Sequence, residues 1–382
     1  MKSWDIIIIG GGIIGLSLSI ALRKRGARVL VVERGEPGRE ASHAAGGMLV
    51  DCLVETPPPL QALASASARM YPEFAHELEV ESGMKVDLRD QGTILSLSVE
   101  HIRHPQLRTA QPLLLSPEQL IESESALGTL NLEQELDLRE RGVKLHDPAA
   151  AAAAMFGPAF YLKERSVDPR ALSTAAWKTA KNRGVDFSSG DEVTSVLIAD
   201  RYATGVTTIK TTFHGAKVVN CAGAWSGQIA PHTFPTRPVK GQMLCLLMPE
   251  RDLLRHVIRT PDVYLITRSD GRLLVGATVE EAGFDKRTDS ATIQRLHRSA
   301  LAIVPKLKDA KILEDWAGLR PGTPDALPIL GATATPGYYV ATGHFRDGIL
   351  LAPITAHVMA DVITGRTPEY DLTAFAPSRF HP

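Results

Sequence analysis

Three glycines near the beginning of the sequence have the spacing of a phosphate-binding turn. They are Gly10, Gly12 and Gly15, in the stretch Asp5-Ile-Ile-Ile-Ile-Gly-Gly-Gly-Ile-Ile-Gly15. In turns of this kind the first glycine permits a sharp bend after a strand, the second lets the backbone approach a pyrophosphate, and the third lets helix and strand pack closely. The phosphates then lie at the N-terminus of the helix, where unpaired N–H groups favour negative charge.

Glu33 supplies the carboxylate that a nucleotide site of this kind needs. It ends the apolar run of residues 29–33, and at the tip of a second strand it would accept hydrogen bonds from the hydroxyls of an adenosine ribose. An acid at this place disfavours a 2′-phosphate and hence NADP. The pattern predicts a dinucleotide site, and the glycines alone do not distinguish NAD from FAD.

The sequence around these residues predicts the elements that position them. Residues 13–25 have the composition of a helix that ends in Arg23, Lys24 and Arg25 and stops at Gly26. With the strands on either side, this helix forms a βαβ unit. The uncharged run of residues 6–22 could also be the core of an export signal, but three consecutive glycines would break the helix that such a signal requires.

Composition limits the other classes of function. A chain of 382 residues predicts two domains, and a formal charge of −1 with a pI near 6.9 gives no electrostatic basis for binding nucleic acid or an anionic membrane. Cys52, Cys221 and Cys245 lie far apart, which suits a reducing cytoplasm and offers neither a disulfide framework nor a zinc site. We expect a soluble cytoplasmic protein without a metal site, and we interpret His101 and His104 as residues of a solvated loop.

The remaining chain contains further predicted elements. No GxSxG or GK[ST] motif is present, so hydrolase and nucleotide triphosphatase motifs are lacking. The sequence predicts helices over residues 60–83, 149–154 and 166–184, the last two introduced by Asp147-Pro148 and Asp168-Pro169. It predicts strands within residues 86–98, 192–198 and 204–213, and a buried strand from residue 217 that breaks into small residues.

Five segments carry a resemblance to a known superfamily. Besides the glycine turn, they are residues 40–49 (EASHAAGGML), 166–172 (SVDPRAL), 220–226 (NCAGAWS), 316–331 (WAGLRPGTPDALPILG) and 337–353 (GYYVATGHFRDGILLAP). In this order they resemble the D-amino acid oxidase superfamily of FAD enzymes. The last segment is most similar to bacterial glycine oxidases, which are linked to thiazole formation in thiamine biosynthesis.

The resemblance implies an α/β (α+β) fold of two domains. One is a Rossmann-like FAD-binding domain of the glutathione-reductase type, assembled from residues 1–85, 165–235 and 315–382. The other, residues 86–164 and 236–314, is a substrate-binding domain built on an antiparallel sheet over the flavin. A homo-oligomer is compatible with this class, and neither nucleic acid nor membrane is an expected partner.

The resemblance also implies noncovalent FAD and the residues that hold it. Gly10, Gly12, Gly15 and Glu33 would hold the ADP half, and small residues from Ala45 to Met48 would let backbone N–H groups reach the flavin. His344 is expected to have a structural rather than an acid–base role. The complete predicted set of cofactor-binding residues is Gly10, Gly12, Ile13, Ile14, Gly15, Glu33, Arg34, Ala45, Gly46, Gly47, Met48, Val193, Ala222, Gly223, Arg320, His344, Arg346, Asp347, Gly348 and Ile349.

Three residues are the predicted catalytic set. Arg320 matches the arginine that binds a substrate carboxylate in bidentate fashion, Tyr264 matches a tyrosine that donates to the same carboxylate, and Arg346 matches a second arginine at the edge of the site. The implied reaction is oxidative deamination of glycine or another small amino acid or amine. A hydride passes from the α carbon to flavin N5, and the products are the 2-oxo acid, ammonia and, from molecular oxygen, hydrogen peroxide.

Alternatives stay open at this point. A D-amino acid or N-methyl amino acid dehydrogenase would pass electrons to an acceptor other than oxygen, a flavin-binding subunit of a complex would lack its own catalysis, and an NAD dehydrogenase would lack flavin. Arg320 could also be a solvated surface arginine and Tyr264 a core tyrosine. Three departures from the family concern the size of the substrate: Val279 replaces a methionine, Asp262 precedes Tyr264, and residues 129–156 form a longer segment.

Overall fold

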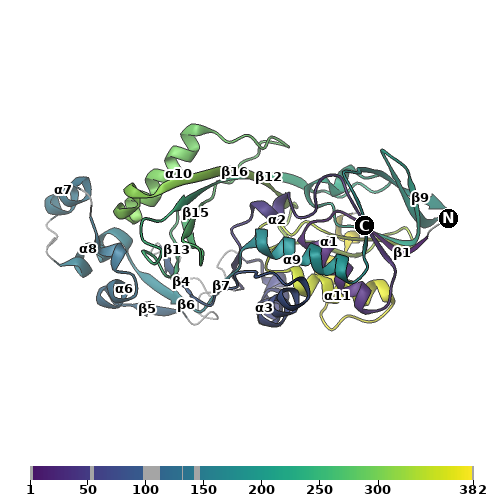
Figure 1. Ribbon diagram of the computed structural model, residues 1–382, viewed down its shortest axis with the longest axis horizontal. Helices are drawn as coiled ribbons and strands as arrows, with labels where there is room; N and C mark the ends of the chain where they lie inside the picture. The colour runs from purple at the N-terminus through teal and green to yellow at the C-terminus, as the bar shows by residue number, and fades with distance from the viewer. Residues whose placement is uncertain (1–2, 52–55, 98–111, 131, 142–146, 381–382) are drawn as a thin grey trace.

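The computed structural model describes residues 3–51, 56–97, 112–130, 132–141 and 147–380. The molecule consists of two parts that lie end to end, each built on an eight-stranded sheet (Figure 1). We call the part with both termini the first domain and the other part the second domain. Cys52, His101 and His104 lie outside the described residues, so the predictions on them stay predictions.

The first domain has a parallel sheet with one antiparallel edge, in the order β17-β18-β11-β1-β2-β8. A hairpin, β9 with β10, joins this sheet through β11. The strands are β1 (Trp4–Ile9), β2 (Val29–Glu33), β8 (Asp186–Ser189), β9 (Val193–Ala199), β10 (Tyr202–Thr208), β11 (Thr212–Asn220), β17 (Ile329–Ala332) and β18 (Tyr338–Thr342).

Strand β1 is buried on both faces because the domain has layers on both sides of the sheet. Ile6 and Ile8 pack on the helical side, and Ile7 and Ile9 pack on the side of the β9–β10 hairpin. The helical layer contains α1 (Ile13–Lys24), α3 (Gln61–Ser82), α9 (Pro169–Asn182) and α11 (Ala352–Thr364). The predicted βαβ unit and the helices after residues 60 and 168 are confirmed.

One predicted strand is wrong. Residues 204–213 do not form a single strand, because the chain turns after Thr208 and only then enters β11. The Thr208 hydroxyl accepts hydrogen bonds from the N–H groups of Lys210 and Thr211 at 3.2 and 2.9 Å, which closes the turn. No glycine or proline marks the turn, so the sequence pattern gave no sign of it.

The second domain has a sheet in the order β16-β12-β15-β14-β13-β4-β6-β5. Its pairs are antiparallel except for the parallel pair of β13 and β4, so the predicted antiparallel sheet has one exception. The strands are β4 (Thr93–Ser96), β5 (Leu113–Leu115), β6 (Ala159–Leu162), β12 (Arg237–Leu247), β13 (Val257–Arg259), β14 (Tyr264–Thr267), β15 (Arg272–Gly276) and β16 (Lys311–Gly322).

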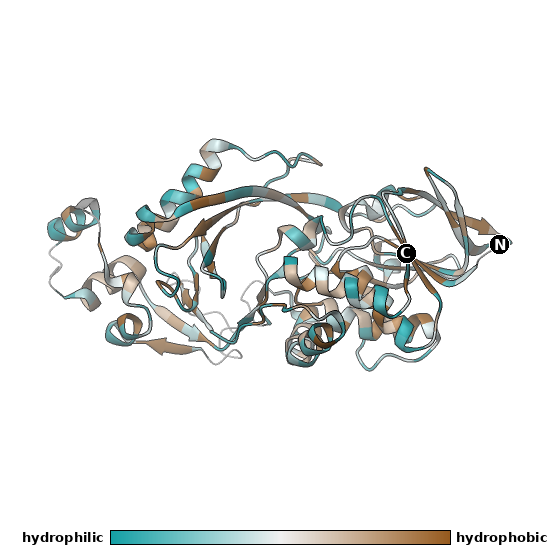
Figure 2. Ribbon diagram, in the orientation of Figure 1, coloured by the Kyte–Doolittle hydropathy of each residue, from teal (hydrophilic) through white to brown (hydrophobic). Residues whose placement is uncertain are grey.

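Helices cover the outer face of this second sheet. Leu244, Leu246 and Leu265 pack there against α10 through Leu296 and Ala300. The helices of this domain are α6 (Pro117–Ser123), α7 (Leu132–Glu140), α8 (Pro148–Phe156) and α10 (Ser290–Ile303). In Figure 2 α10 carries both hydrophobic and hydrophilic residues, as expected of a helix with one buried side. The other face of the sheet carries a small cluster with Met243, Ile266 and Trp316, and this face turns toward the first domain.

The two domains are joined by long strands and by short crossing segments. Strands β12 and β16 pair from Arg237↔Gly322 to Leu247↔Lys311 and arch from one domain toward the other (Figure 1). The division predicted at residue 315 therefore falls inside β16. Near the junction, β3 (Met48–Leu49) pairs with β7 (Arg165–Ser166), and the short helix α2 (Ala41–Ala44) contacts β16. No helix in the described ranges is long and apolar enough to cross a membrane.

Candidate cofactor and substrate site

A cavity of about 730 Å³ lies where the two domains meet. It is lined by the glycine turn, by the segment from Glu40 to Val50, by the β13–β14 turn, and by residues from Ala341 to Ile349. Its volume falls in the range of cofactor and ligand sites. All predicted cofactor-binding and catalytic residues line it except Gly15, which is buried in α1. Within the described residues, no group of three His, Cys, Asp or Glu gathers as metal ligands would.

The glycine turn brings the backbone to one end of the cavity. Gly10 has a φ of 101°, and a Cβ there would lie 2.6 Å from the carbonyl oxygen of Cys221. A Cβ at Gly15 would collide with the carbonyl oxygen of Gly10, so this glycine allows α1 to pack on β1. Gly12 is the N-cap of α1 and lines the cavity. The turn thus places the N-terminus of α1 against the cavity, where phosphates are stabilised.

Ser42 is a site residue that the sequence reasoning missed. Its hydroxyl accepts a hydrogen bond of 2.9 Å from the N–H of Ile13, the first residue of α1. It lines the cavity from α2, so it brings a hydroxyl beside the helix terminus. The two residues are 29 positions apart, and only the fold brings them together.

Glu33 is buried at the end of β2 and ties the turn together. Its two carboxylate oxygens accept hydrogen bonds from the N–H groups of Gly11 at 2.7 Å and Gly35 at 2.8 Å. Each oxygen retains a further lone pair, and the residue lines the cavity. The carboxylate of Glu33 is therefore already held in place to accept hydrogen bonds from the hydroxyls of a ribose.

The segment from Ala45 to Met48 brings bare backbone to the middle of the cavity. A Cβ at Gly46 would lie 2.7 Å from Cδ1 of Ile266, and a Cβ at Gly47, whose φ is 78°, would collide with the carbonyl oxygen of Val167. A side chain at Gly47 would meet backbone and adopt a strained φ, and a side chain at Gly46 would have to displace the end of Ile266. The indole N–H of Trp316 donates to the carbonyl of Ala44 at 3.1 Å and holds the start of this segment.

The segment from His344 to Ile349 closes another side of the cavity. His344 is buried, and its Nε2 lies 3.1 Å from the hydroxyl of Thr355 in α11. Burial lowers the pKa of His344 to about 3, so this side chain is neutral near pH 7. The helix that follows begins at Ala352, three positions beyond the last predicted cofactor residue, Ile349.

Arg320 and Tyr264 lie together at the second-domain side of the cavity. The Nη1 atom of Arg320 donates to the carbonyls of Thr278 at 3.0 Å and Lys240 at 3.3 Å. Burial lowers the pKa of Arg320, which the adjacent Tyr264 opposes, and burial raises the pKa of Tyr264. The hydroxyl of Tyr264 lies 3.9 Å from Sδ of Met243. Arg346 is exposed at the same side, and its charge acts on Tyr264.

Two glycines of the second sheet make room for these side chains. A Cβ at Gly241 would collide with the guanidinium of Arg320, and a Cβ at Gly276 would lie 2.8 Å from Cε2 of Tyr264. The sequence reasoning did not select either residue, although a glycine inside a strand marks close approach of another group. Val279 and Asp262, two departures from the family pattern, both line the cavity.

The donors and acceptors along the cavity fit FAD. The lining offers a helix terminus for phosphates at Gly12, an acid for a ribose at Glu33, and backbone without side chains for a flat ring at Gly46 and Gly47, together with apolar contacts. Cys221 lines the cavity, but burial raises the pKa of its thiol, so it stays protonated and is a poor nucleophile toward a flavin.

Comparison with known proteins agrees with this fit. The model of the family described as FAD dependent oxidoreductase (DAO) matches residues 5–362. The chain is 34% identical over 380 residues to the Bifunctional protein ThiO/ThiG of Trichormus variabilis, covering 98% of this chain and 55% of that protein. It is 31% identical over 390 residues to the Glycine oxidase of Pseudomonas aeruginosa, covering 98% of each. This chain thus spans about half the length of the bifunctional relatives.

A solved structure has the same fold. The crystal structure of glycine oxidase from Geobacillus kaustophilus superposes with a TM-score of 0.88 at 28% identity, covering 99% of both chains. The α/β two-domain fold predicted from the sequence is confirmed. The chain belongs to the FAD dependent oxidoreductase (DAO) family, and FAD is its cofactor.

Proposed function

We propose that this protein is an amino acid oxidase that deaminates glycine or another small amino acid or amine. The products would be the 2-oxo acid and ammonia, with molecular oxygen reduced to hydrogen peroxide. The observation that carries the proposal is the pair of Arg320 and Tyr264 in the cavity, because a guanidinium and a phenol side by side are donors for a carboxylate. The likeness to glycine oxidases supports the same substrate class.

The protein's part in this reaction is to bind and orient the substrate. The bonds from Nη1 of Arg320 to two backbone carbonyls fix the plane of the guanidinium before a substrate arrives. The carboxylate would be bound there and by the hydroxyl of Tyr264, with Arg346 adding positive charge at the exposed edge. FAD, when bound, supplies the redox chemistry by accepting a hydride from the α carbon. None of the three residues needs to act as a base.

The lining beside Arg320 favours a small substrate. Tyr264, Met243 and Gly276 crowd together at this end, and the hydroxyl of Tyr264 faces the sulfur of Met243. Val279 is 53% exposed and lies at the opening of the cavity. As the resemblance to bacterial glycine oxidases implies, we place the reaction in the supply of thiazole for thiamine biosynthesis.

The proposal is tested with purified protein and a panel of glycine, sarcosine, D-alanine, D-proline and L-amino acids. Flavin absorbance is recorded under nitrogen, and peroxide is measured in air. Bleaching together with peroxide would support the oxidase. Bleaching without peroxide would instead identify a dehydrogenase that uses another acceptor, and no bleaching with any compound would reject the substrate class.

A pair of variants tests the role of Arg320 in the same assay. Arg320→Met removes the carboxylate donor and is expected to raise KM by about tenfold or more, the worth of a charged hydrogen bond. Arg251→Met is the matched control, because Arg251 is exposed and binds only the carbonyl of Ser269 in the described residues. Equal KM values for the two variants would show that Arg320 does not bind the substrate, and a lack of turnover of every amine by the wild type would favour a flavin-binding subunit without its own catalysis.

A further inference from the structure

Arg268 is a buried cation directly behind the cavity. Its side chain is 1% exposed, and it is the largest fully buried side chain in the described part of the molecule. It follows β14 at the same two-residue spacing as Tyr264 and Ile266, so the three residues share one face of the chain. It does not line the cavity itself.

All three residues on this face contact Gly46. A Cβ at Gly46 would lie 2.7 Å from Cδ1 of Ile266 and 3.5 Å from Cε2 of Tyr264. Nη2 of Arg268 donates a hydrogen bond of 2.5 Å to the carbonyl oxygen of Gly46. One strand therefore supports both the candidate substrate-binding tyrosine and the glycine segment that lines the middle of the cavity.

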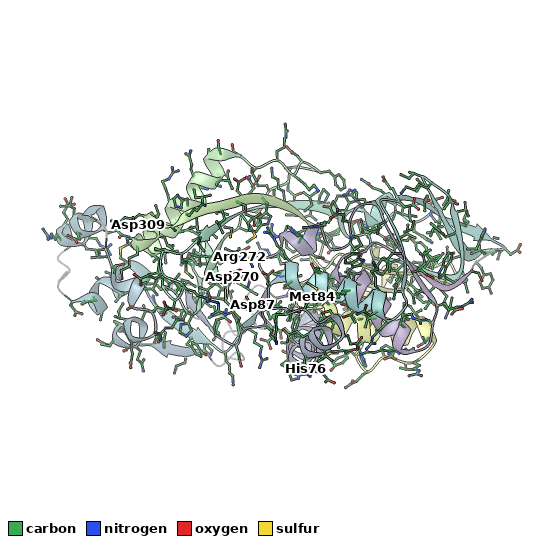
Figure 3. The ribbon with its side chains drawn as sticks, in the orientation of Figure 1. His76, Met84, Asp87, Asp270, Arg272 and Asp309 are labelled. Atoms are coloured by element: carbon green, nitrogen blue, oxygen red, sulfur yellow. The ribbon has the colours of Figure 1, made fainter. Side chains whose placement is uncertain are left out.

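Nearby carboxylates balance the positive charge of Arg268 but do not accept hydrogen bonds from it. Asp168 and Asp87 oppose the effect of burial, which lowers the pKa of Arg268 to about 10 and leaves it charged near pH 7. Asp168 is bound instead by Nη2 of Arg272 at 2.7 Å, and Arg272 also binds Asp270 at 2.7 Å. Figure 3 labels Asp87, Asp270 and Arg272 together at the junction of the domains. In the described residues, Nε and Nη1 of Arg268 have no hydrogen-bond partner.

The hydrogen bond from Arg268 to the carbonyl of Gly46 determines the orientation of the peptide between Gly46 and Gly47. The peptide from Gly46 to Gly47 is trans, so its carbonyl oxygen and its N–H point in opposite directions. With the carbonyl held toward Arg268, the N–H of Gly47 points away from Arg268, and Gly46, Gly47 and Met48 all line the cavity. The buried, charged side chain of Arg268 thus orients the peptide between Gly46 and Gly47.

We infer that Arg268 is a positioning residue for FAD. It fixes the peptide between Gly46 and Gly47 so that an N–H donor faces the ring of the cofactor, and it adds a buried positive charge behind that peptide. Both effects favour negative charge on the reduced ring. The inference rests on FAD as the cofactor and does not depend on which amine is oxidised.

The test compares Arg268→Gln with Arg272→Met. The second variant removes an arginine of the same charged cluster that does not contact the Gly46 segment. For each holoenzyme the midpoint potential of the flavin and the thermal unfolding temperature are measured, and the FAD dissociation constant is measured after removal and readdition of FAD. We expect Arg268→Gln to lower the midpoint potential and to weaken FAD binding about tenfold, beyond any effect of Arg272→Met.

A conservative variant separates charge from folding. Arg268→Lys keeps the charge and is expected to recover more than half of the change in potential, and it replaces Arg268→Gln if that variant does not fold. If the Arg268 variants lower the unfolding temperature as Arg272→Met does, yet keep the wild-type potential and FAD dissociation constant, the residue is structural only and the inference is wrong. Because no readout uses turnover, this outcome is independent of the proposed oxidase activity.

Discussion

The guanidinium of Arg320 occupies the space that a side chain at position 241 would need. A Cβ at Gly241 would collide with Nη1, Nη2 and Cζ of Arg320, although the two residues belong to different strands, β12 and β16. The same guanidinium is held by the carbonyls of Lys240 and Thr278 on either side. The position of the guanidinium of Arg320 therefore depends on these two backbone carbonyls and on the lack of a side chain at Gly241.

Gly241→Ala should displace Arg320 without touching the dinucleotide end of the cavity. We expect KM for the preferred amine to rise about tenfold or more, with FAD content unchanged, because the carboxylate loses a preorganised donor. Steady-state kinetics and the flavin spectrum measure the two quantities. Gly283→Ala is the control: the φ of 57° at Gly283 makes alanine strained there, but its Cβ would meet nothing within 4 Å, so the variant can lose stability and should leave KM unaltered. An unchanged KM in Gly241→Ala would contradict the proposed role of Arg320.

Glu33→Gln should weaken FAD binding. The amide keeps the shape of the side chain but turns one acceptor toward the N–H of Gly11 or Gly35 into a donor. A buried donor facing a donor costs about 1–3 kcal/mol, and we expect the FAD dissociation constant to rise about tenfold or more. Titration of the apoprotein with FAD gives the constant. Glu36→Gln, in an exposed pair with Arg39, should bind FAD like the wild type, and equal constants for the two variants would refute the role of Glu33.

His344 should make the protein less stable in acid. Its pKa in the folded protein is about 3, below the value of about 6.5 in an unfolded chain, so below pH 6.5 the unfolded chain takes up a proton that the folded protein does not. The stability present above pH 6.5 is then lost as the pH falls toward 3, by up to about 1.4 kcal/mol per pH unit. The difference between the free energies of unfolding at pH 7 and at pH 5 should be smaller in His344→Gln than in the wild type. Identical pH slopes for both proteins would show that another group causes the loss.

The loop between Glu280 and α10 should slow the release of FAD. Phe284 in this loop packs on Trp225 with ring centroids 5.2 Å apart, and the guanidinium of Arg34 lies 3.5 Å from the centroid of the Trp225 ring. Lys286 of the same loop pairs with Glu40 at 3.1 Å, so the second domain reaches across to residues that line the cavity. Phe284→Ala should speed FAD dissociation about fivefold, the worth of one aromatic pair. Tyr202→Ala, which removes an exposed aromatic ring elsewhere, should leave the rate unchanged, and an equal rate in both variants would reject a role for the loop.

Local signals in the sequence were enough to predict the dinucleotide end of the site. The turn at Gly10, the acid Glu33 and the Asp168 cap of α9 depend on residues that are close in sequence, and each has the predicted structure. The boundary within β16 could not be predicted in this way. Which sheet a strand joins depends on its partner, and residues of β16 pair with residues of β12 that lie 64 to 85 positions earlier.

Ser42 and Gly241 could not be predicted for the same reason, because segments that are distant in sequence bring them into the site. Ser42 becomes part of the site only because α2 meets the N-terminus of α1, and Gly241 only because β16 brings Arg320 beside it. The strand predicted over residues 204–213 failed for a local reason, because a threonine hydroxyl closes the turn that glycine or proline usually marks. Resemblance to a family supplied Arg320 and Tyr264, which no spacing in this sequence would have selected.

The order of the strands also bears on how the protein is made. β1 pairs with β11, and β11 pairs with β18, so strands that are made at different stages of synthesis lie side by side. The wall from Ala341 to Ile349 is made after every other segment that lines the cavity. The cavity can therefore enclose FAD only once β18 and this wall have been synthesised and folded, so a cell short of flavin would accumulate protein with a finished cavity that lacks its cofactor.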